Sequence, residues 1–177
     1  FNQKYTDWYN KTTYYMTALP KILESKTKIR FQDCDPLNHL NNSKYLDYLI
    51  NAREDQLIEH YDLNIFENAK ITGTTWVVGS HQIAYIRPAF VMETVTIQSQ
   101  LLQYGKKQLL VEIRMYNEDK TVLKAVMWSS FVHFNVLKGK AHDHKEKFIS
   151  LFKNVVLPVE ETNFNERVKS LRLATVS

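Results

Sequence analysis

The chain has 177 residues and a net charge of +4; 44% of its residues are hydrophobic and 24% are charged. These values indicate one soluble globular core. The chain has only four Gly and four Pro, so we expect no long flexible linker. A single cysteine excludes an internal disulfide, no apolar run reaches the ~18 residues of a membrane span, and the interspersed basic residues do not favour nucleic-acid binding. We therefore expect a cytoplasmic protein with no membrane or nucleic-acid partner.

The N-terminal part of the chain predicts an accessory segment followed by a strand. Residues 1–22 combine aromatic residues at helical spacing with Thr and Tyr pairs that favour extended chain. The first strand is predicted over residues 26–33, where Ile29 and Phe31 alternate with basic residues. The loop that follows contains Pro36, which cannot continue a strand ladder.

A long helix is predicted over residues 42–61. Its apolar residues recur at the spacing of one helical face, and Asn41 or Asn42 is suited to cap its N-terminus. The residues of this apolar stripe are Leu46, Leu49, Ile50 and Leu57.

The remainder of the chain predicts a sheet and two short helices. The strands are predicted over residues 75–86, 93–103, 108–116 and 122–136. The last of these is apolar on both faces near its centre, as a central strand covered on both sides would be. The short helices are predicted over residues 144–156 and 163–173. The order indicates an α+β fold with one helix against a curved antiparallel sheet: a domain over 23–139 and a C-terminal helical extension over 140–177.

Two aspartates precede the long helix, and two interpretations of them remain open. In the first interpretation, Asp33 and Asp35 cap a turn or the helix, as aspartate commonly does. Alternatively, a carboxylate beside the unpaired N–H groups at a helix start would lie next to an oxyanion site, where it would act as general base or nucleophile in acyl transfer.

Asn38 and His39 lie in the same loop and are also open to two interpretations. Asn38 suits a left-handed position, or is an ordinary exposed loop residue. His39 would orient a substrate or share in proton transfer, or is a hydrogen-bonded loop histidine. The spacing of Asp33, Asp35 and His39 matches no common metal-ligand pattern, so we predict no metal, and the His-Asp-His sequence at 142–144 is interpreted as a solvated turn.

Arg53 falls inside the apolar stripe of the helix. A buried guanidinium is costly unless it is paired, so we predict a structural ion pair with a carboxylate, or a contact with a carbonyl.

The sequence of residues 29–53, IRFQDCDPLNHLNNSKYLDYLINAR, resembles the hotdog-fold acyl-CoA thioesterases of the 4-hydroxybenzoyl-CoA thioesterase type. Those proteins show Asp-x-Asp-x-x-Gly-His-x-Asn-Asn, then Tyr-Leu and Ala-Arg. The matching positions here are Asp33, Asp35, His39, Asn41, Asn42, Tyr45, Leu46, Ala52 and Arg53. A weaker match is IAYIRPAF at 83–90, through Tyr85 and Pro88, and the resemblance extends over residues 26–137.

The resemblance implies a long central helix wrapped by an antiparallel sheet, homodimers joined sheet edge to edge or homotetramers, and active sites at the dimer interface. It also implies that Asp35 is the nucleophile or general base, and that backbone N–H groups at the helix start polarise the thioester carbonyl. The chain departs from the pattern where Asn38 replaces glycine, where Asn51 replaces an acidic residue, and where Met92-Glu93 replaces Gly-Asp.

We therefore expect an acyl-CoA thioesterase of fatty acid metabolism that releases free acid and CoA, without a cofactor because CoA is part of the substrate. The expected catalytic residues are Asp35 and His39; the loop-shaping residues are Asn38, Leu40, Asn41 and Asn42; and the pocket residues are Tyr45, Trp76 and Tyr85. Two alternatives remain: a thioesterase acting on acyl carrier protein, or a non-catalytic acyl-binding protein.

Overall fold

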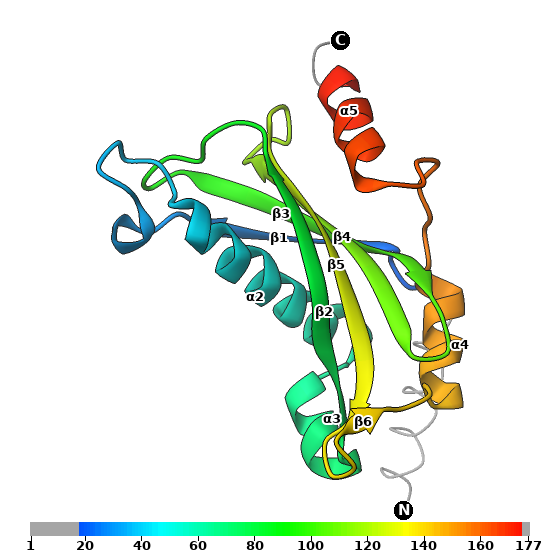
Figure 1. Ribbon diagram of the computed structural model, residues 1–177. Coiled ribbons are helices and arrows are strands. Elements are labelled where there is room, and N and C mark those ends of the chain that lie inside the picture. The colour runs from blue at the N-terminus through cyan, green and yellow to red at the C-terminus, as the bar shows by residue number, and fades with distance from the viewer. Residues whose placement is uncertain (1–17, 175–177) are drawn as a thin grey trace, which may run out of the picture.

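The computed structural model describes residues 18–174 as a curved antiparallel sheet around a long helix (Figure 1). The strands are β1 (Ile22–Lys28), β2 (Thr74–Tyr85), β3 (Thr94–Tyr104), β4 (Gln108–Asn117), β5 (Leu123–Asn135) and β6 (Lys140–Ala141). The helices are the short 3-10 turn η2 (Phe31–Asp33), α2 (Asn42–Tyr61), α3 (Ile65–Thr72), α4 (Glu146–Val155) and α5 (Phe164–Ala174). Residues 1–17 of the accessory segment predicted over residues 1–22 lie outside the described part of the chain.

The predicted α+β architecture is confirmed, and α2 has the predicted bounds. The bounds predicted for the first strand are wrong, because β1 ends at Lys28 and the chain then turns. In this turn the Asp33 N–H donates to the Arg30 carbonyl oxygen, and Phe31 is 77% exposed. Phe31 therefore fits the apolar alternation of a strand in the sequence, although it lies in the turn after β1. The short elements α3 and β6 have no counterpart in the prediction.

Strand β2 forms one edge of the sheet, whose order is β1-β3-β4-β5-β2 with β6 paired to the end of β5. Neighbouring strands are antiparallel. The outer edge of β2 has no partner among the described residues, although the strand is twelve residues long. Val77 and Val78 on this strand are partly exposed. A long apolar edge of this kind is a template for pairing with another chain.

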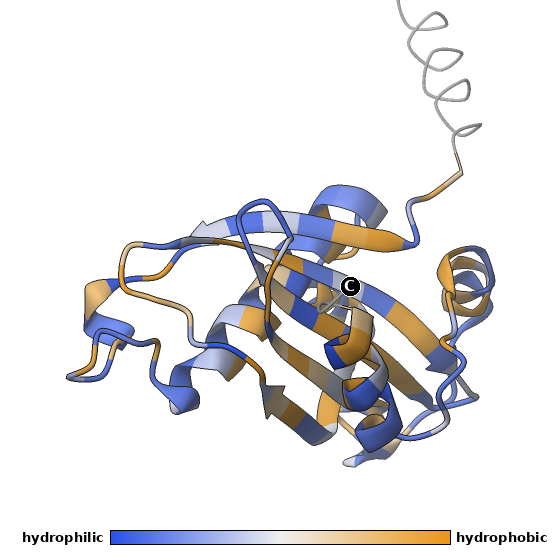
Figure 2. Ribbon diagram, turned by 90° about the horizontal axis from the view of Figure 1, so that it is seen from above, coloured by the Kyte–Doolittle hydropathy of each residue, from blue (hydrophilic) through white to orange (hydrophobic). Residues whose placement is uncertain are grey.

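The main core lies between α2 and the concave face of the sheet. Asn41 caps α2, since its side-chain oxygen accepts from the Ser43 N–H at 3.0 Å. Leu49 of α2 is fully buried against alternate residues of the strands, and Figure 2 shows this alternation along them. The second-to-last helix, α4, inserts Phe148 and Phe152 into the same core. The predicted C-terminal extension therefore contributes to the core.

Helix α5 covers the opposite, convex face of the sheet. Val126 and Trp128 alternate with the concave residues of β5, so they point to this face. There they pack with Phe164 and Val168 of α5 in a second apolar cluster. Each face of β5 is thus covered by a helix, as its apolar centre predicted.

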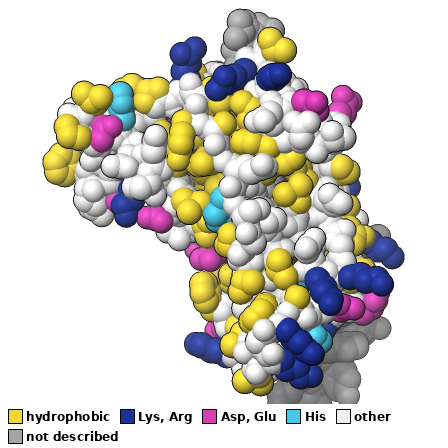
Figure 3. Space-filling view, viewed as in Figure 1, with side chains coloured by type: hydrophobic (Ala, Val, Ile, Leu, Met, Phe, Trp, Pro, Cys, Tyr) yellow, Lys and Arg dark blue, Asp and Glu magenta, His cyan; other side chains and the backbone are white. Residues whose placement is uncertain are grey.

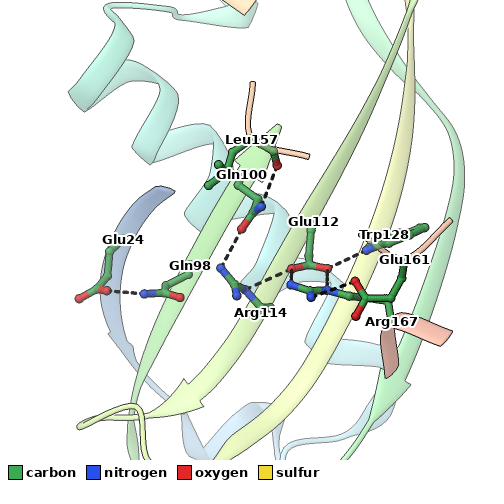
Figure 4. A network of polar contacts seen from close by, with 9 residues as sticks. All are labelled: Glu24, Gln98, Gln100, Glu112, Arg114, Trp128, Leu157, Glu161 and Arg167. Carbon is green, nitrogen blue, oxygen red and sulfur yellow. Dashed lines mark hydrogen bonds and ion pairs between the residues drawn. The ribbon is translucent and has the colours of Figure 1, made fainter. Parts of the chain in front are cut away.

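A buried carboxylate joins α5 to the sheet (Figure 4). Glu112 of β4 is completely buried, and both of its oxygens accept hydrogen bonds from Arg167 of α5, at 2.8 and 2.9 Å. The Trp128 indole N–H donates to the same carboxylate at 2.8 Å, and Arg114 lies 3.4 Å from it. Arg167 is in turn within 3.3 Å of Glu161, in the segment that leads into α5. The hydrogen bonds that Arg167 donates to Glu112 raise the pKa of Arg167.

Candidate active site

The segment from η2 to the start of α2 holds the two aspartates in different environments. Asp33 is bound to α2: its Oδ2 accepts from the Tyr48 hydroxyl at 2.8 Å, and its carbonyl oxygen accepts from the Asn41 N–H. The Tyr48 hydroxyl also accepts from the Arg30 N–H. Asp33 therefore ties the loop to the first turns of α2, which is a structural task.

Asp35 has one oxygen committed and one free. Its Oδ1 accepts from the backbone N–H groups of Leu37 at 2.9 Å and His39 at 3.0 Å. Within the described part of the chain, Oδ2 has no hydrogen-bond partner. The side chain is only partly buried, so a ligand can reach this second oxygen. A carboxylate held rigidly on one side and open on the other is suited to act as a base or nucleophile.

Asn38 occupies the left-handed conformation that the loop requires, with φ of 61°. Its N–H donates to the Asp35 carbonyl oxygen at 3.0 Å, and its own carbonyl oxygen accepts from the Val91 N–H. Asn tolerates this conformation better than most non-glycine residues. Asn38 thus meets the backbone requirement of the turn at the position where the pattern described above has glycine.

We expect Asn38→Gly to preserve both thermal stability and the activity proposed below, because glycine adopts positive φ without strain. Asn38→Val should lower the free energy of unfolding by about 1–2 kcal/mol, because a β-branched residue is strained at this φ. Thermal unfolding of the two variants beside the wild type measures the difference. Equal stability of the glycine and valine variants would contradict the assignment.

His39 contributes through its backbone, and its ring lies against a neighbouring loop. Its N–H holds Asp35, and its carbonyl oxygen accepts from the Asp35 N–H at 2.8 Å. The imidazole packs edge-on against Phe90, with ring centroids 5.1 Å apart. The next residue, Leu40, is buried and donates its N–H to the Ala89 carbonyl oxygen. The aspartate loop is thereby fastened to the segment that precedes β3.

The backbone amide of Asn42 is a free donor at the start of α2. The neighbouring amides are occupied: Asn41 donates to Asp33, Ser43 to the Asn41 side chain, and Lys44 to the Asn41 carbonyl. Within residues 18–174 the Asn42 N–H has no acceptor. It therefore offers a hydrogen-bond donor at the positive end of the helix dipole, on the same loop as Asp35.

The three expected pocket residues do not lie together. Tyr45 and Tyr85 meet beside the start of α2, with ring centroids 5.1 Å apart, and the Tyr85 hydroxyl donates to the Asn42 carbonyl oxygen. Tyr45 is buried, and its hydroxyl accepts from the Ala89 N–H. Burial raises its pKa. Trp76 lies near the other end of β2: the β2–β5 ladder has eleven cross-strand pairs, with Trp76 in the third and Tyr85 in the last.

The surroundings of Trp76 correct the interpretation of residues 142–144. The Trp76 indole N–H donates to Nε2 of His144 at 3.0 Å, and Nδ1 of His144 faces the Gly105 carbonyl oxygen at 2.9 Å. His144 is only 8% exposed, so a solvated turn is wrong for this residue. Burial lowers its pKa, and the neutral ring packs among aromatic side chains. No cluster of His, Cys, Asp or Glu suited to a metal ion occurs among the described residues.

Arg53 binds a hydroxyl in place of the predicted carboxylate. Its Nη1 donates to Oγ of Ser99 on β3 at 3.0 Å, and Ser99 donates to Gln56 one turn further along α2. Among the described residues Arg53 has no ion pair. Burial lowers its pKa to about 10, so the guanidinium remains charged at neutral pH. The residue fixes α2 to the sheet, and only the fold shows that a serine lies opposite it.

An apolar cavity beside the C-terminal half of α2 was missed by sequence reasoning. It is lined by α2, by the concave face of the sheet and by α4. Its lining residues are Ile50, Arg53, Glu54, Leu57, Tyr61, Leu63, Ile65, Trp76, Leu101, Leu109, Phe131, Leu151, Phe152 and Val155. The apolar stripe of α2 was the one local signal for this cavity. It indicates that one face of the helix is buried, but it does not indicate which elements lie opposite that face.

The fold and the aspartate loop agree with comparisons to known proteins. A family model described as the thioesterase-like superfamily matches residues 29–157. The chain belongs to this superfamily. It is 35% identical over 121 residues to the long-chain acyl-CoA thioesterase FadM of Escherichia coli K12, over 67% of this chain and 88% of FadM. The resemblance to hotdog thioesterases, and the prediction of a thioesterase, are thereby confirmed.

Two solved structures share the fold of this chain. The probable thioesterase YbaW from Escherichia coli is 26% identical with a TM-score of 0.65, over 76% of this chain and 99% of that one. The Staphylococcus aureus protein SAV2348, solved in complex with CoA, is 14% identical with a TM-score of 0.70, over 82% of this chain and 93% of that one. Helix α5 lies beyond the last residue matched by the family model.

Proposed function

We propose that this thioesterase hydrolyses acyl-CoA to a free carboxylic acid and CoA, with Asp35 as the general base or nucleophile. The proposal rests above all on the two free polar groups of one loop, Oδ2 of Asp35 and the backbone amide of Asn42. The first is suited to deliver a nucleophile, and the second to bind the oxyanion that forms on the thioester carbonyl.

Two chemical routes fit this arrangement. As general base, Asp35 takes a proton from water while the water oxygen attacks the carbonyl carbon, and the Asn42 N–H stabilises the tetrahedral oxyanion. Collapse breaks the carbon–sulfur bond, and the CoA thiolate takes up the proton. As nucleophile, Oδ2 itself attacks and forms an acyl anhydride with release of CoA, and water then hydrolyses the anhydride. Both routes give the same products.

The other loop residues support Asp35 in this proposal. Asn38, Leu40 and Asn41 shape the loop through backbone contacts and the helix cap. His39, as the second catalytic residue, would turn its ring toward the substrate from its place beside Phe90. The aromatic pair of Tyr45 and Tyr85 would border the reacting carbon, and Trp76 the far end of the acyl site.

A second copy of the chain would complete the site. The unpaired edge of β2 suits antiparallel pairing with the same strand of another protomer, giving a homodimer, and two such dimers would form the homotetramer. A two-fold axis through such a strand pair brings the Thr74 end of one β2 beside the Tyr85 end of the other. Since Tyr85 binds the start of α2, the active site would lie at this interface.

The charge at the Thr74 end of the sheet favours a phosphorylated carrier of the acyl group. Exposed lysines gather there, at the β3–β4 turn, the β5–β6 turn and the start of α4, and Figure 3 shows basic side chains at the lower end of this face. They are Lys106, Lys107, Lys138, Lys140, Lys145 and Lys147. In the proposed dimer they would face the partner's aspartate loop, where they would attract the phosphates of CoA or an acidic acyl carrier protein.

The carrier is tested by measuring thiol release from the same acyl group on CoA and on acyl carrier protein at equal concentration. We expect a kcat/KM at least about tenfold higher for the CoA thioester, since CoA phosphates are compact ligands for clustered lysines. A preference for the carrier-protein thioester would establish the alternative substrate. Binding of acyl-CoA without release of thiol would establish a non-catalytic acyl-binding protein.

The cellular setting of the proposal is fatty acid metabolism in the cytoplasm. FadM, the relative above, is a long-chain acyl-CoA thioesterase by name. None of the helices in the described part of the chain has the length and hydropathy needed to cross a membrane.

A further inference from the structure

The apolar cavity beside α2 is small and lies far from the proposed reacting carbon. Its volume is about 70 Å³, little more than two water molecules occupy in the liquid at ~30 Å³ each. Arg53 and Leu57 of α2 are on its wall, and they follow Asn42 by 11 and 15 residues. At a rise of about 1.5 Å per residue, they lie roughly 17 and 22 Å along the helix from the free amide.

That distance equals the length of a long acyl chain. An extended chain built from C–C bonds of about 1.5 Å advances roughly 1.25 Å per carbon, so 17–22 Å corresponds to about 13–18 carbons. Partly buried apolar side chains continue between the two places: Leu46 and Ile50 on α2, and Ile83 and Phe131 on the sheet. A chain that starts at the Asn42 amide and follows this path reaches the cavity with its last carbons.

Helix α4 forms one wall of the cavity. Leu151, Phe152 and Val155 project from α4 into the lining. The helix is held firmly, because Phe152 packs on the rings of Trp76 and His144. Just beyond α4, the Leu157 N–H donates to the Leu101 carbonyl oxygen at 2.8 Å. These contacts hold α4 against the sheet, and the side chains on this wall limit how far a ligand can extend.

We propose that α4 limits the length of the acyl chain that the site accepts. In this proposal the cavity receives the terminal carbons of long-chain acyl groups, and Leu151 sets the end of the site. The inference rests on the proposed function, since it assumes that the thioester lies at Asp35 and Asn42. Leu151 is a specificity-determining residue in this account and takes no part in the chemistry.

The test compares kcat/KM for octanoyl-CoA and hexadecanoyl-CoA in the wild type and in Leu151→Trp. The indole would fill the cavity, so about two methylenes of the longer chain would lose their burial, at ~0.8 kcal/mol each. This lowers kcat/KM for hexadecanoyl-CoA by roughly 15-fold. Octanoyl-CoA does not reach the cavity, and its kcat/KM should change less than about twofold. Lys153→Trp, an exposed position on the same helix, is the matched control and should change neither value.

Equal losses for both substrates, or no loss for either, would overturn the inference. A second measurement on the wild type does not depend on how the variant folds: photo-crosslinking with hexadecanoic acid that carries a diazirine at its terminal carbon. Crosslinks to Leu151, Phe152 or Val155 are expected, and crosslinks confined to other elements would overturn the inference. Crosslinks to α4 without turnover of any acyl-CoA would sustain the acyl site and refute only the proposed hydrolysis.

Discussion

Asp35→Asn should abolish the hydrolysis of every acyl-CoA that the wild type accepts, with kcat reduced by at least about 10³-fold. The amide has no basic or nucleophilic oxygen, whereas its Oδ1 can still accept from the Leu37 and His39 N–H groups. The loop should therefore keep its shape while the chemistry stops. The measurement is release of free CoA, trapped by a chromogenic disulfide, over a panel of acyl-CoAs.

Asp33→Asn is the matched control, because it makes the same chemical change two residues away. The amide oxygen can still accept from the Tyr48 hydroxyl, so we expect kcat within about threefold of the wild type. Unaltered thermal unfolding in both variants would exclude a folding defect. Full activity in Asp35→Asn, or equal losses in the two variants, would refute the assignment of Asp35.

Arg167→Met should lower the free energy of unfolding by about 3 kcal/mol, because it leaves the fully buried Glu112 carboxylate without its bidentate partner. The Trp128 indole and Arg114 still contact that carboxylate, and they keep the loss from being larger. For a chain of this size the melting temperature should fall by about 6–12 °C. Thermal and urea unfolding measure the change.

A second substitution separates the charge effect from simple loss of packing under α5. Adding Glu112→Gln to Arg167→Met should recover part of the lost stability, because a neutral amide costs less to bury than a carboxylate. Lys26→Ala removes the exposed ion pair with Glu118 and should cost less than about 1 kcal/mol. If the double variant were less stable than Arg167→Met, the uncompensated charge would not be the cause.

Several features of this protein follow from local sequence alone. The period of Leu46, Leu49 and Leu57 together with the Asn41 cap predicted α2 with its correct bounds, because helix periodicity and capping act within a few residues. Alternation likewise predicted the four strands after α2 to within about two residues at each end. The aspartate loop could be recognised because its residues match the pattern of the hotdog thioesterases at consecutive positions of the chain.

The tertiary structure decided which of these residues share a site and which do not. Asp33 differs from Asp35 because Tyr48, fifteen residues away, reaches only the first of them. Arg53 meets Ser99 from a distant strand, where the sequence indicated only that some partner was needed.

The apolar cavity and the packing of α4 depend even more on the fold. The cavity joins α2, the sheet and α4, which is separated from α2 by about ninety residues. Leu57 and Leu151 both line it, although the amphipathic pattern of each helix indicates only that the helix has a buried side. Local preferences thus determined the elements and the loop of this protein, whereas packing between distant segments decided the buried partners of Glu112 and Arg53 and formed the apolar cavity.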